Sequence, residues 1–128
     1  MTKINVHTKN SELNLQKGKY FIFFTGGHSV TIYNKFKIII QDKKTNLKIG
    51  LFTTWIATGY ENGQRTAKYY EFEIKENGIY SIDIEHPEQL IIKKSKLNLK
   101  NLFYSLISKD GLRVKESEKN ILIRKQIY

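Results

Sequence analysis

Apolar and polar residues alternate along much of this chain, and residues 69–85 show the pattern most clearly. Every second residue is apolar in 70–74 and again in 80–84, on either side of Asn77-Gly78. A period of two is typical of strands with one buried face. An Asn-Gly pair is a frequent turn between two such strands. The segment therefore predicts an antiparallel hairpin with one apolar face and one wet face.

The alternation also predicts how the two arms of this hairpin pair. A three-residue loop ending at Gly78 sets Ile74 opposite Tyr80, and only this register keeps the apolar side chains on one face. Such a loop needs a positive φ at its last residue, which glycine adopts without strain. On the wet face, the same register sets Glu71 opposite Asp83.

Short alternating segments recur along the rest of the chain at intervals of about eight to twelve residues, which is typical of sandwiches and barrels. They lie at residues 2–8, 13–15, 20–24, 30–32, 36–40, 47–56, 90–92 and 121–128. The segment 20–24 is apolar at every position, which predicts a central strand covered on both faces. Residues 58–66, with two glycines, are expected to form the largest exposed loop.

One segment near the C-terminus has a different period. Apolar residues in 97–111 recur at three- and four-residue spacing, as on one face of a helix, with Asn98 and Gly111 as candidate caps. Residues 97–109 would also suit a strand. The sequence predicts one domain, residues 1–128, with an all-β fold: a mostly antiparallel β-sandwich of about eight or nine strands with one short helix near the C-terminus.

The net charge of +10 allows two interpretations. A basic surface can bind a polyanion such as nucleic acid or an anionic membrane. Lysine outnumbers arginine 19 to 3, however, and arginine is the residue that base and phosphate recognition usually recruits. We favour codon usage in an AT-rich genome as the source of the lysines. Any nucleic-acid binding is then expected to be non-specific and to weaken steeply with salt.

The chain contains no cysteine, so thiol catalysis, disulfides and cysteine-ligated metals are excluded. The spacing of His7, His28 and His86 matches no metal-binding motif, and we predict no metal and no cofactor. No run of residues reaches the length of a membrane span, and the N-terminus lacks the apolar core of a signal peptide. The expected location is the cytoplasm.

Two groups of residues are candidates for acid–base chemistry. Glu71 and Asp83, if adjacent, could act as a hydrolase pair, or lysines of neighbouring strands could neutralise them. His28 and Ser29 are neighbours in sequence, but adjacent strand residues point to opposite faces and do not form a nucleophile–base pair. We favour the interpretation without catalysis, and predict no catalytic residue.

The best candidate for a ligand site is an aromatic patch at one end of the sandwich, where loops tend to carry function. Its members are Trp55, Tyr60, Arg65, Tyr69 and His28. The alternative for Trp55 is a place in the core.

Three functions remain open from the sequence. The favoured one is a non-enzymatic binding module whose partner is another protein or a small ligand. The second is a polyanion-binding protein, and the third is a small hydrolase using Glu71 and Asp83. The sequence does not identify the ligand or the oligomeric state.

Overall fold

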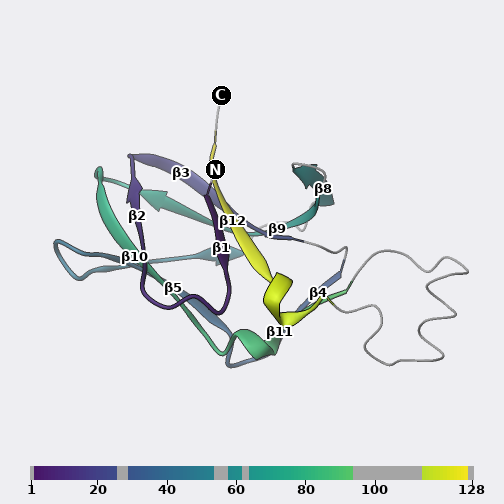
Figure 1. The fold of residues 1–128 in the computed structure, drawn as a ribbon. Coiled ribbons are helices and arrows are strands. Elements are labelled where there is room, and N and C mark those ends of the chain that lie inside the picture. Colours follow the sequence, from purple (N-terminus) through teal and green to yellow (C-terminus); the bar gives the residue numbers. More distant parts are fainter. Residues whose placement is uncertain (1, 26–28, 54–57, 62–63, 94–113, 127–128) are drawn as a thin grey trace, which may run out of the picture.

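The computed structural model describes residues 2–25, 29–53, 58–61, 64–93 and 114–126 (Figure 1). The strands in this part of the chain are β1 (Thr2–Asn5), β2 (Ser11–Leu15), β3 (Gly18–Thr25), β4 (Ser29–Ile32), β5 (Lys37–Asp42), β6 (Lys48–Ile49), β7 (Phe52–Thr53), β8 (Thr58–Glu61), β9 (Gln64–Ile74), β10 (Gly78–Glu85), β11 (Leu90–Lys93) and β12 (Asn120–Lys125). Two short 3-10 helices, η1 (Pro87–Gln89) and η2 (Glu116–Glu118), precede β11 and β12.

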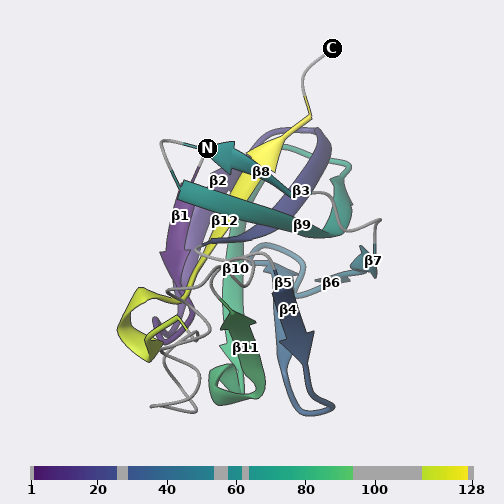
Figure 2. The same cartoon turned by 90° about the vertical axis from the view of Figure 1, so that its right-hand side faces the viewer.

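All the strand pairs described are antiparallel, which confirms the predicted all-β class. The larger sheet has the order β1-β12-β3-β9-β7, with β8 also pairing with β9. The second sheet has the order β2-β10-β5-β6, and β11 with β4 forms a third, two-stranded sheet. Strands of the first two sheets run in clearly different directions, as β9 and β10 do in Figure 2.

One apolar core lies between the sheets, and the alternation seen in the sequence supplies it. Alternate residues of each long strand are buried, as expected when a strand has one inner face. The core includes Ile4, Tyr20, Ile22, Phe24, Phe72, Ile74, Ile121 and Ile123 from the larger sheet, and Leu15, Ile38, Ile40, Tyr80, Ile82 and Ile84 from the four-stranded sheet. Leu90 and Ile92 of β11 extend it.

The predicted hairpin at residues 69–85 is wrong in its pairing. Its two arms are β9 and β10, but β9 pairs with β3, β7 and β8, while β10 pairs with β2 and β5. The connection between them crosses from one sheet to the other, so both arms turn their apolar residues into the same core from opposite sides. Ile74 is therefore paired with Gly18, and not with Tyr80.

Two related predictions change with this pairing. The positive φ predicted for Gly78 is wrong, because Gly18 is the one described glycine with a positive φ. The expected loop at residues 58–66 is a hairpin instead, because β8 pairs with β9 from Thr58↔Ala67 to Glu61↔Gln64. Residues 62–63, between the two strands in sequence, lie outside the described residues.

Three further predictions concern the segments 20–24, 121–128 and 97–111. Strand β3 is central, as predicted, between β12 and β9. Its outer residues Phe21 and Phe23 are only half-buried, so its outer face is not fully covered. Strand β12 confirms a strand in the predicted segment 121–128, but it ends at Lys125, and residues 127–128 lie outside the described residues. The helix predicted at residues 97–111 lies outside the described residues.

Candidate binding groove between the sheet edges

Strands β6 and β7 end their sheets on the same side of the molecule, and a groove opens beside them. Among the described strands, β6 pairs with β5 alone and β7 with β9 alone, so each is the outermost strand of its sheet. The cavity has a volume of about 590 Å³. We call it the edge groove; its lining comprises Asp42, Thr45, Leu47, Lys48, Ile49, Gly50, Phe52, Glu73, Lys75, Glu76 and Tyr80.

The apolar part of the edge groove is unusually open to solvent. Leu47 is 67% exposed and Phe52 is 66% exposed, the two highest values among the exposed large hydrophobic residues of the described chain. Ile49 lies between them in sequence and packs against the core. Because burial of such side chains is favourable, two neighbouring exposed ones mark a surface suited to contact with another molecule.

The break between β6 and β7 explains why these side chains are exposed. Leu47, Ile49 and Leu51 alternate in phase, whereas Phe52 is one residue out of phase. The chain leaves the four-stranded sheet after Ile49 and joins the larger sheet at Phe52, where Phe52 pairs with Glu71. Register partners share a face, so Phe52 lies on the outer face of the larger sheet.

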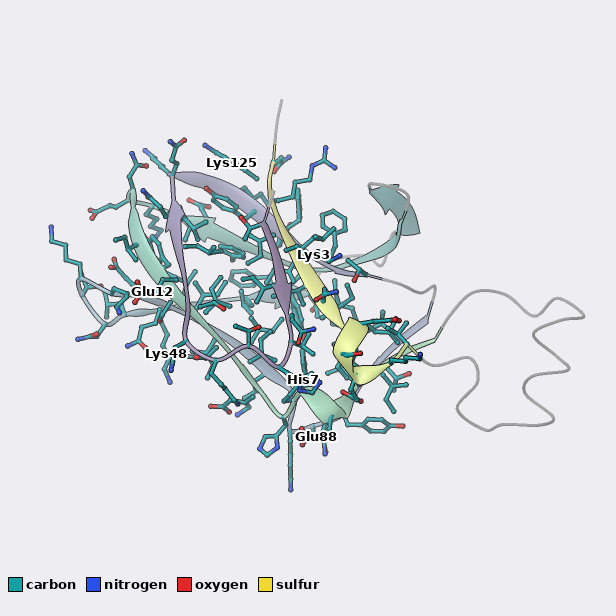
Figure 3. All side chains as sticks on the ribbon, in the orientation of Figure 1. Lys3, His7, Glu12, Lys48, Glu88 and Lys125 are labelled. Carbon is teal, nitrogen blue, oxygen red and sulfur yellow. The ribbon has the colours of Figure 1, made fainter. Side chains whose placement is uncertain are left out.

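The polar lining of the edge groove differs in charge from the rest of the chain. Three carboxylates, Asp42, Glu73 and Glu76, accompany two lysines, Lys48 and Lys75. Lys48, labelled in Figure 3, is exposed in the edge strand β6. The groove is thus slightly acidic on a chain with net charge +10.

Tyr80 is the buried member of the lining, and its hydroxyl is held in place. The Tyr80 hydroxyl donates a hydrogen bond of 2.7 Å to the backbone oxygen of Glu76. Burial, followed by the charges of Asp42 and Glu76, raises the pKa of Tyr80 above its ordinary value. The hydroxyl therefore remains a protonated donor at neutral pH.

The structure brings together only some members of the predicted aromatic patch. Trp55 and His28 lie outside the described residues. Tyr60 and Arg65 are direct cross-strand partners in the β8–β9 hairpin. Tyr69 follows on the same strand as Arg65.

A β-bulge turns Tyr69 toward the core. Phe23 pairs with Lys68 and Ile22 pairs with Tyr70, so Tyr69 is the extra residue on β9. The Tyr69 ring meets Phe24 edge-on with centroids 5.6 Å apart, and meets Tyr70 with centroids 4.7 Å apart. A bulge redirects side chains in this way, and here it adds Tyr69 to the edge of the core.

The predicted pairing of Glu71 with Asp83 is wrong, because the two residues belong to different sheets. Each lies on the outer face of its own sheet, alternating with buried residues, so the core separates them. A carboxylate oxygen of Glu71 lies 3.2 Å from the Lys19 ammonium. Asp83 accepts a hydrogen bond from the backbone N–H of Asn10. Glu71 and Asp83 therefore do not form the carboxylate pair that the hydrolase hypothesis requires.

A second polar cluster joins the start of the chain to η2. One Glu116 oxygen lies 2.9 Å from His7 Nε2, and the other lies 2.5 Å from the Lys119 ammonium. Lys119 is buried and also donates to the backbone oxygen of Leu90. Burial raises the pKa of Glu116, but the hydrogen bonds from Lys119 and His7 outweigh it and leave the pKa lowered. This cluster braces the fold, since each polar group has a partner.

Comparison with protein-family models, with curated proteins and with solved structures finds no match for this chain. Among the described residues, no group of three or more His, Cys, Asp or Glu side chains is placed to hold a metal ion. No helix in this part of the chain is long and apolar enough to cross a membrane.

Proposed function

We propose that this protein is a non-enzymatic binding module that holds an extended segment of another protein in the edge groove. The observation that carries the proposal is the exposure of Leu47 and Phe52 beside a cavity of about 590 Å³. Leu47 directly precedes β6 and Phe52 is the first residue of β7, the two strands that end the main sheets on this side.

The two edges suit an extended peptide. An outermost strand has backbone N–H and C=O groups without a strand partner on one side, and a peptide can add to such an edge while its side chains enter neighbouring pockets. An apolar peptide residue would cover Leu47 and Phe52 and remove their surface from water. The carboxylates of Glu73 and Glu76 favour a lysine or arginine beside that residue.

Selection from a display library of random linear peptides tests this proposal. Enriched peptides are expected to combine an apolar residue with a basic one. Leu47→Ala and Phe52→Ala should each weaken a selected peptide about tenfold, as expected when a contact of about 1.4 kcal/mol is lost. Affinity would be measured by fluorescence anisotropy with labelled peptides.

Two exposed apolar residues outside the edge groove provide matched controls. Ile79 is 51% exposed and Tyr33 is 53% exposed. Ile79→Ala and Tyr33→Ala should leave peptide affinity unchanged. The proposal fails if no peptide is enriched, or if the control variants weaken binding as much as the groove variants.

A further inference from the structure

The outer face of the larger sheet carries two aromatic rings on its central strand. In β3, Tyr20, Ile22 and Phe24 are buried in the core, whereas Phe21 and Phe23 lie half-buried on the outer face. The Phe21 and Phe23 rings have centroids 6.5 Å apart and meet edge-on. Unpaired bases stack on neighbouring aromatic rings of a sheet face, and Phe21 and Phe23 are such a pair on a partly exposed face.

Cationic residues lie beside these rings on the neighbouring strands. In the sheet register Arg124 of β12 is opposite Phe21, and Lys3 of β1 follows Phe23 in the same row, beyond Leu122. Register partners share a face, so Arg124 and Lys3 lie on the same side of the sheet as the rings. Both cationic residues are exposed.

A third cation contacts the aromatic pair directly. The Lys19 ammonium lies 5.9 Å from the centroid of the Phe21 ring, within the range of a cation–π interaction. We call Lys3, Lys19, Phe21, Phe23 and Arg124 the aromatic–basic face.

Charge on this side of the sheet is distributed unevenly. The three cations lie on β1, β12 and β3, whereas the carboxylates Glu71 and Glu73 lie on β9. A phosphate backbone would therefore follow β1 and β12, with its bases directed across β3 toward the two rings. Glu71 is 29% exposed and forms an ion pair with Lys19, which reduces its repulsion of the phosphates.

We infer that the aromatic–basic face binds single-stranded nucleic acid, by stacking bases on Phe21 and Phe23 and pairing phosphates with Lys3 and Arg124. A duplex hides its base faces and would gain nothing from the rings. An anionic membrane is disfavoured because the carboxylates Glu71 and Glu73 of β9 would repel it, and because Phe21 and Phe23 are half-buried in the sheet face. Stacking is sequence-tolerant, so the face is expected to bind without a strong sequence preference.

The inference does not depend on the edge groove, and a direct binding experiment tests it. The probes are fluorescein-labelled oligo-dT and oligo-U and a mixed-sequence DNA duplex, with binding followed by anisotropy at several salt concentrations. Both single strands should bind more tightly than the duplex. Phe21→Leu and Phe23→Leu keep apolar bulk but remove the ring, and each should weaken single-strand binding about tenfold, the effect of losing one stacked base.

Charge variants separate this face from a diffuse basic surface. Lys3→Gln should lower the slope of log affinity against log salt by about 0.7, the value for one phosphate contact on a single strand. Lys44→Gln, at an exposed lysine in the β5–β6 turn, should leave the slope unchanged. Tyr33→Leu is the matched aromatic control and should bind as the unmodified protein does.

Several outcomes would overturn the inference. One is no binding of single strands at low salt. Another is that Lys3→Gln and Lys44→Gln weaken single-strand binding equally while Phe21→Leu and Phe23→Leu have no effect on it. Binding to vesicles containing phosphatidylserine that depends on Phe21 and Phe23, with none to oligonucleotides, would assign the face to membranes. If a leucine variant unfolds, backbone NMR shifts of the unmodified protein on adding oligo-dT decide the matter: they must concentrate at residues 21–23 and 122–124.

Discussion

Gly18 stands at the start of β3 with φ at 149°, a conformation that residues with a side chain rarely adopt. A Cβ at this position would also lie 2.7 Å from Cε of Lys125 on the neighbouring strand. The Lys125 side chain is flexible and can move, so the backbone conformation is the larger obstacle. Gly18 is therefore the glycine whose replacement matters most to the described fold.

Gly18→Ala should lower the free energy of unfolding by about 1 to 3 kcal/mol, the usual cost of an unfavourable backbone conformation. Gly50→Ala is the matched control, because nothing lies within 4 Å of the position that its methyl group would occupy and its φ is not positive. Gly50→Ala should leave stability unchanged or slightly raised. Urea unfolding of both variants measures this; equal stability of the two would contradict it.

The surroundings of Tyr70 should have a measurable effect on stability at alkaline pH. Burial, followed by the neighbouring Tyr69, raises the pKa of Tyr70 to about 12. The unfolded chain releases the same proton near the ordinary pKa of about 10. Between these values the folded state holds the proton more tightly, so the free energy of unfolding must fall as the pH rises.

Tyr70→Phe removes this ionisation and should reduce the loss of stability above about pH 10. Urea unfolding between about pH 8 and about pH 11 compares the two proteins, with Tyr33→Phe as an exposed-tyrosine control. Tyr33→Phe should retain the steep alkaline loss. Parallel stability curves for the unmodified protein and Tyr70→Phe would show that Tyr70 ionises normally.

At the scale of elements, two of the tight connections that cross between the four-stranded sheet and the larger one lie side by side. One joins β2 to β3 and the other joins β9 to β10. The backbone N–H of Lys17 in the first donates to Oδ1 of Asn77 in the second, at 2.6 Å. Asn77 therefore ties two crossovers together instead of forming a hairpin.

The two crossovers use the same local sequence. Each contains a glycine followed two residues later by a tyrosine, Gly18 to Tyr20 and Gly78 to Tyr80. Each tyrosine hydroxyl donates to a backbone oxygen four residues upstream, at 2.8 Å in the first and 2.7 Å in the second. A hydrogen bond of this kind fixes the direction in which the chain leaves one sheet and enters the other.

Tyr80→Phe should lower the free energy of unfolding by about 1 kcal/mol, because it leaves a backbone oxygen without its partner. Tyr20→Phe should lower it at least as much, because the Tyr20 hydroxyl also accepts a hydrogen bond from the backbone N–H of Gln16. Tyr33→Phe again serves as the exposed control and should have no effect. Thermal unfolding compares the three variants. A stabilised Tyr80→Phe variant would mean that burying its hydroxyl costs more than the hydrogen bond returns.

The alternation in the sequence predicts burial well and pairing poorly, and Phe72 and Ile82 show why. The sequence places both on one apolar face, and both are buried. A period of two shows which face of a strand is apolar. It does not show whether the next strand pairs with it in the same sheet or packs against it from the opposite sheet, because both arrangements bury the apolar face. The repeated Gly-X-Tyr sequence accompanies the β2–β3 and β9–β10 crossovers, where each tyrosine hydroxyl donates to a backbone oxygen four residues upstream.

The candidate site is less predictable than the fold. The sequence predicts binding at one end of the sandwich, and that prediction rests on aromatic residues such as Trp55. The edge groove depends on Phe52, whose exposure arises where the chain changes sheets between β6 and β7. The change of sheet between β6 and β7 depends on tertiary contacts. Its trace in the sequence is the break in the apolar alternation after Leu51.

At the scale of the whole molecule, the strands differ greatly in how many neighbours protect them. Strands β3 and β12 each have a partner on both sides, whereas β6 and β7 are two residues long and lie at edges. Amide hydrogen exchange followed by NMR should be slowest in β3 and β12 and fastest in β6 and β7. Protection of β7 equal to that of β3 would contradict an open edge.

The position of β12 has a consequence for how the protein is made. Residues 120–125 fill the space between β1 and β3, whose own residues leave the ribosome about a hundred codons earlier. Until β12 arrives, both of these strands lack a neighbour and the larger sheet cannot be completed. Contacts so distant in sequence slow folding. The nascent chain must therefore keep the edge of β3, with its run of phenylalanines, from pairing wrongly for most of its synthesis.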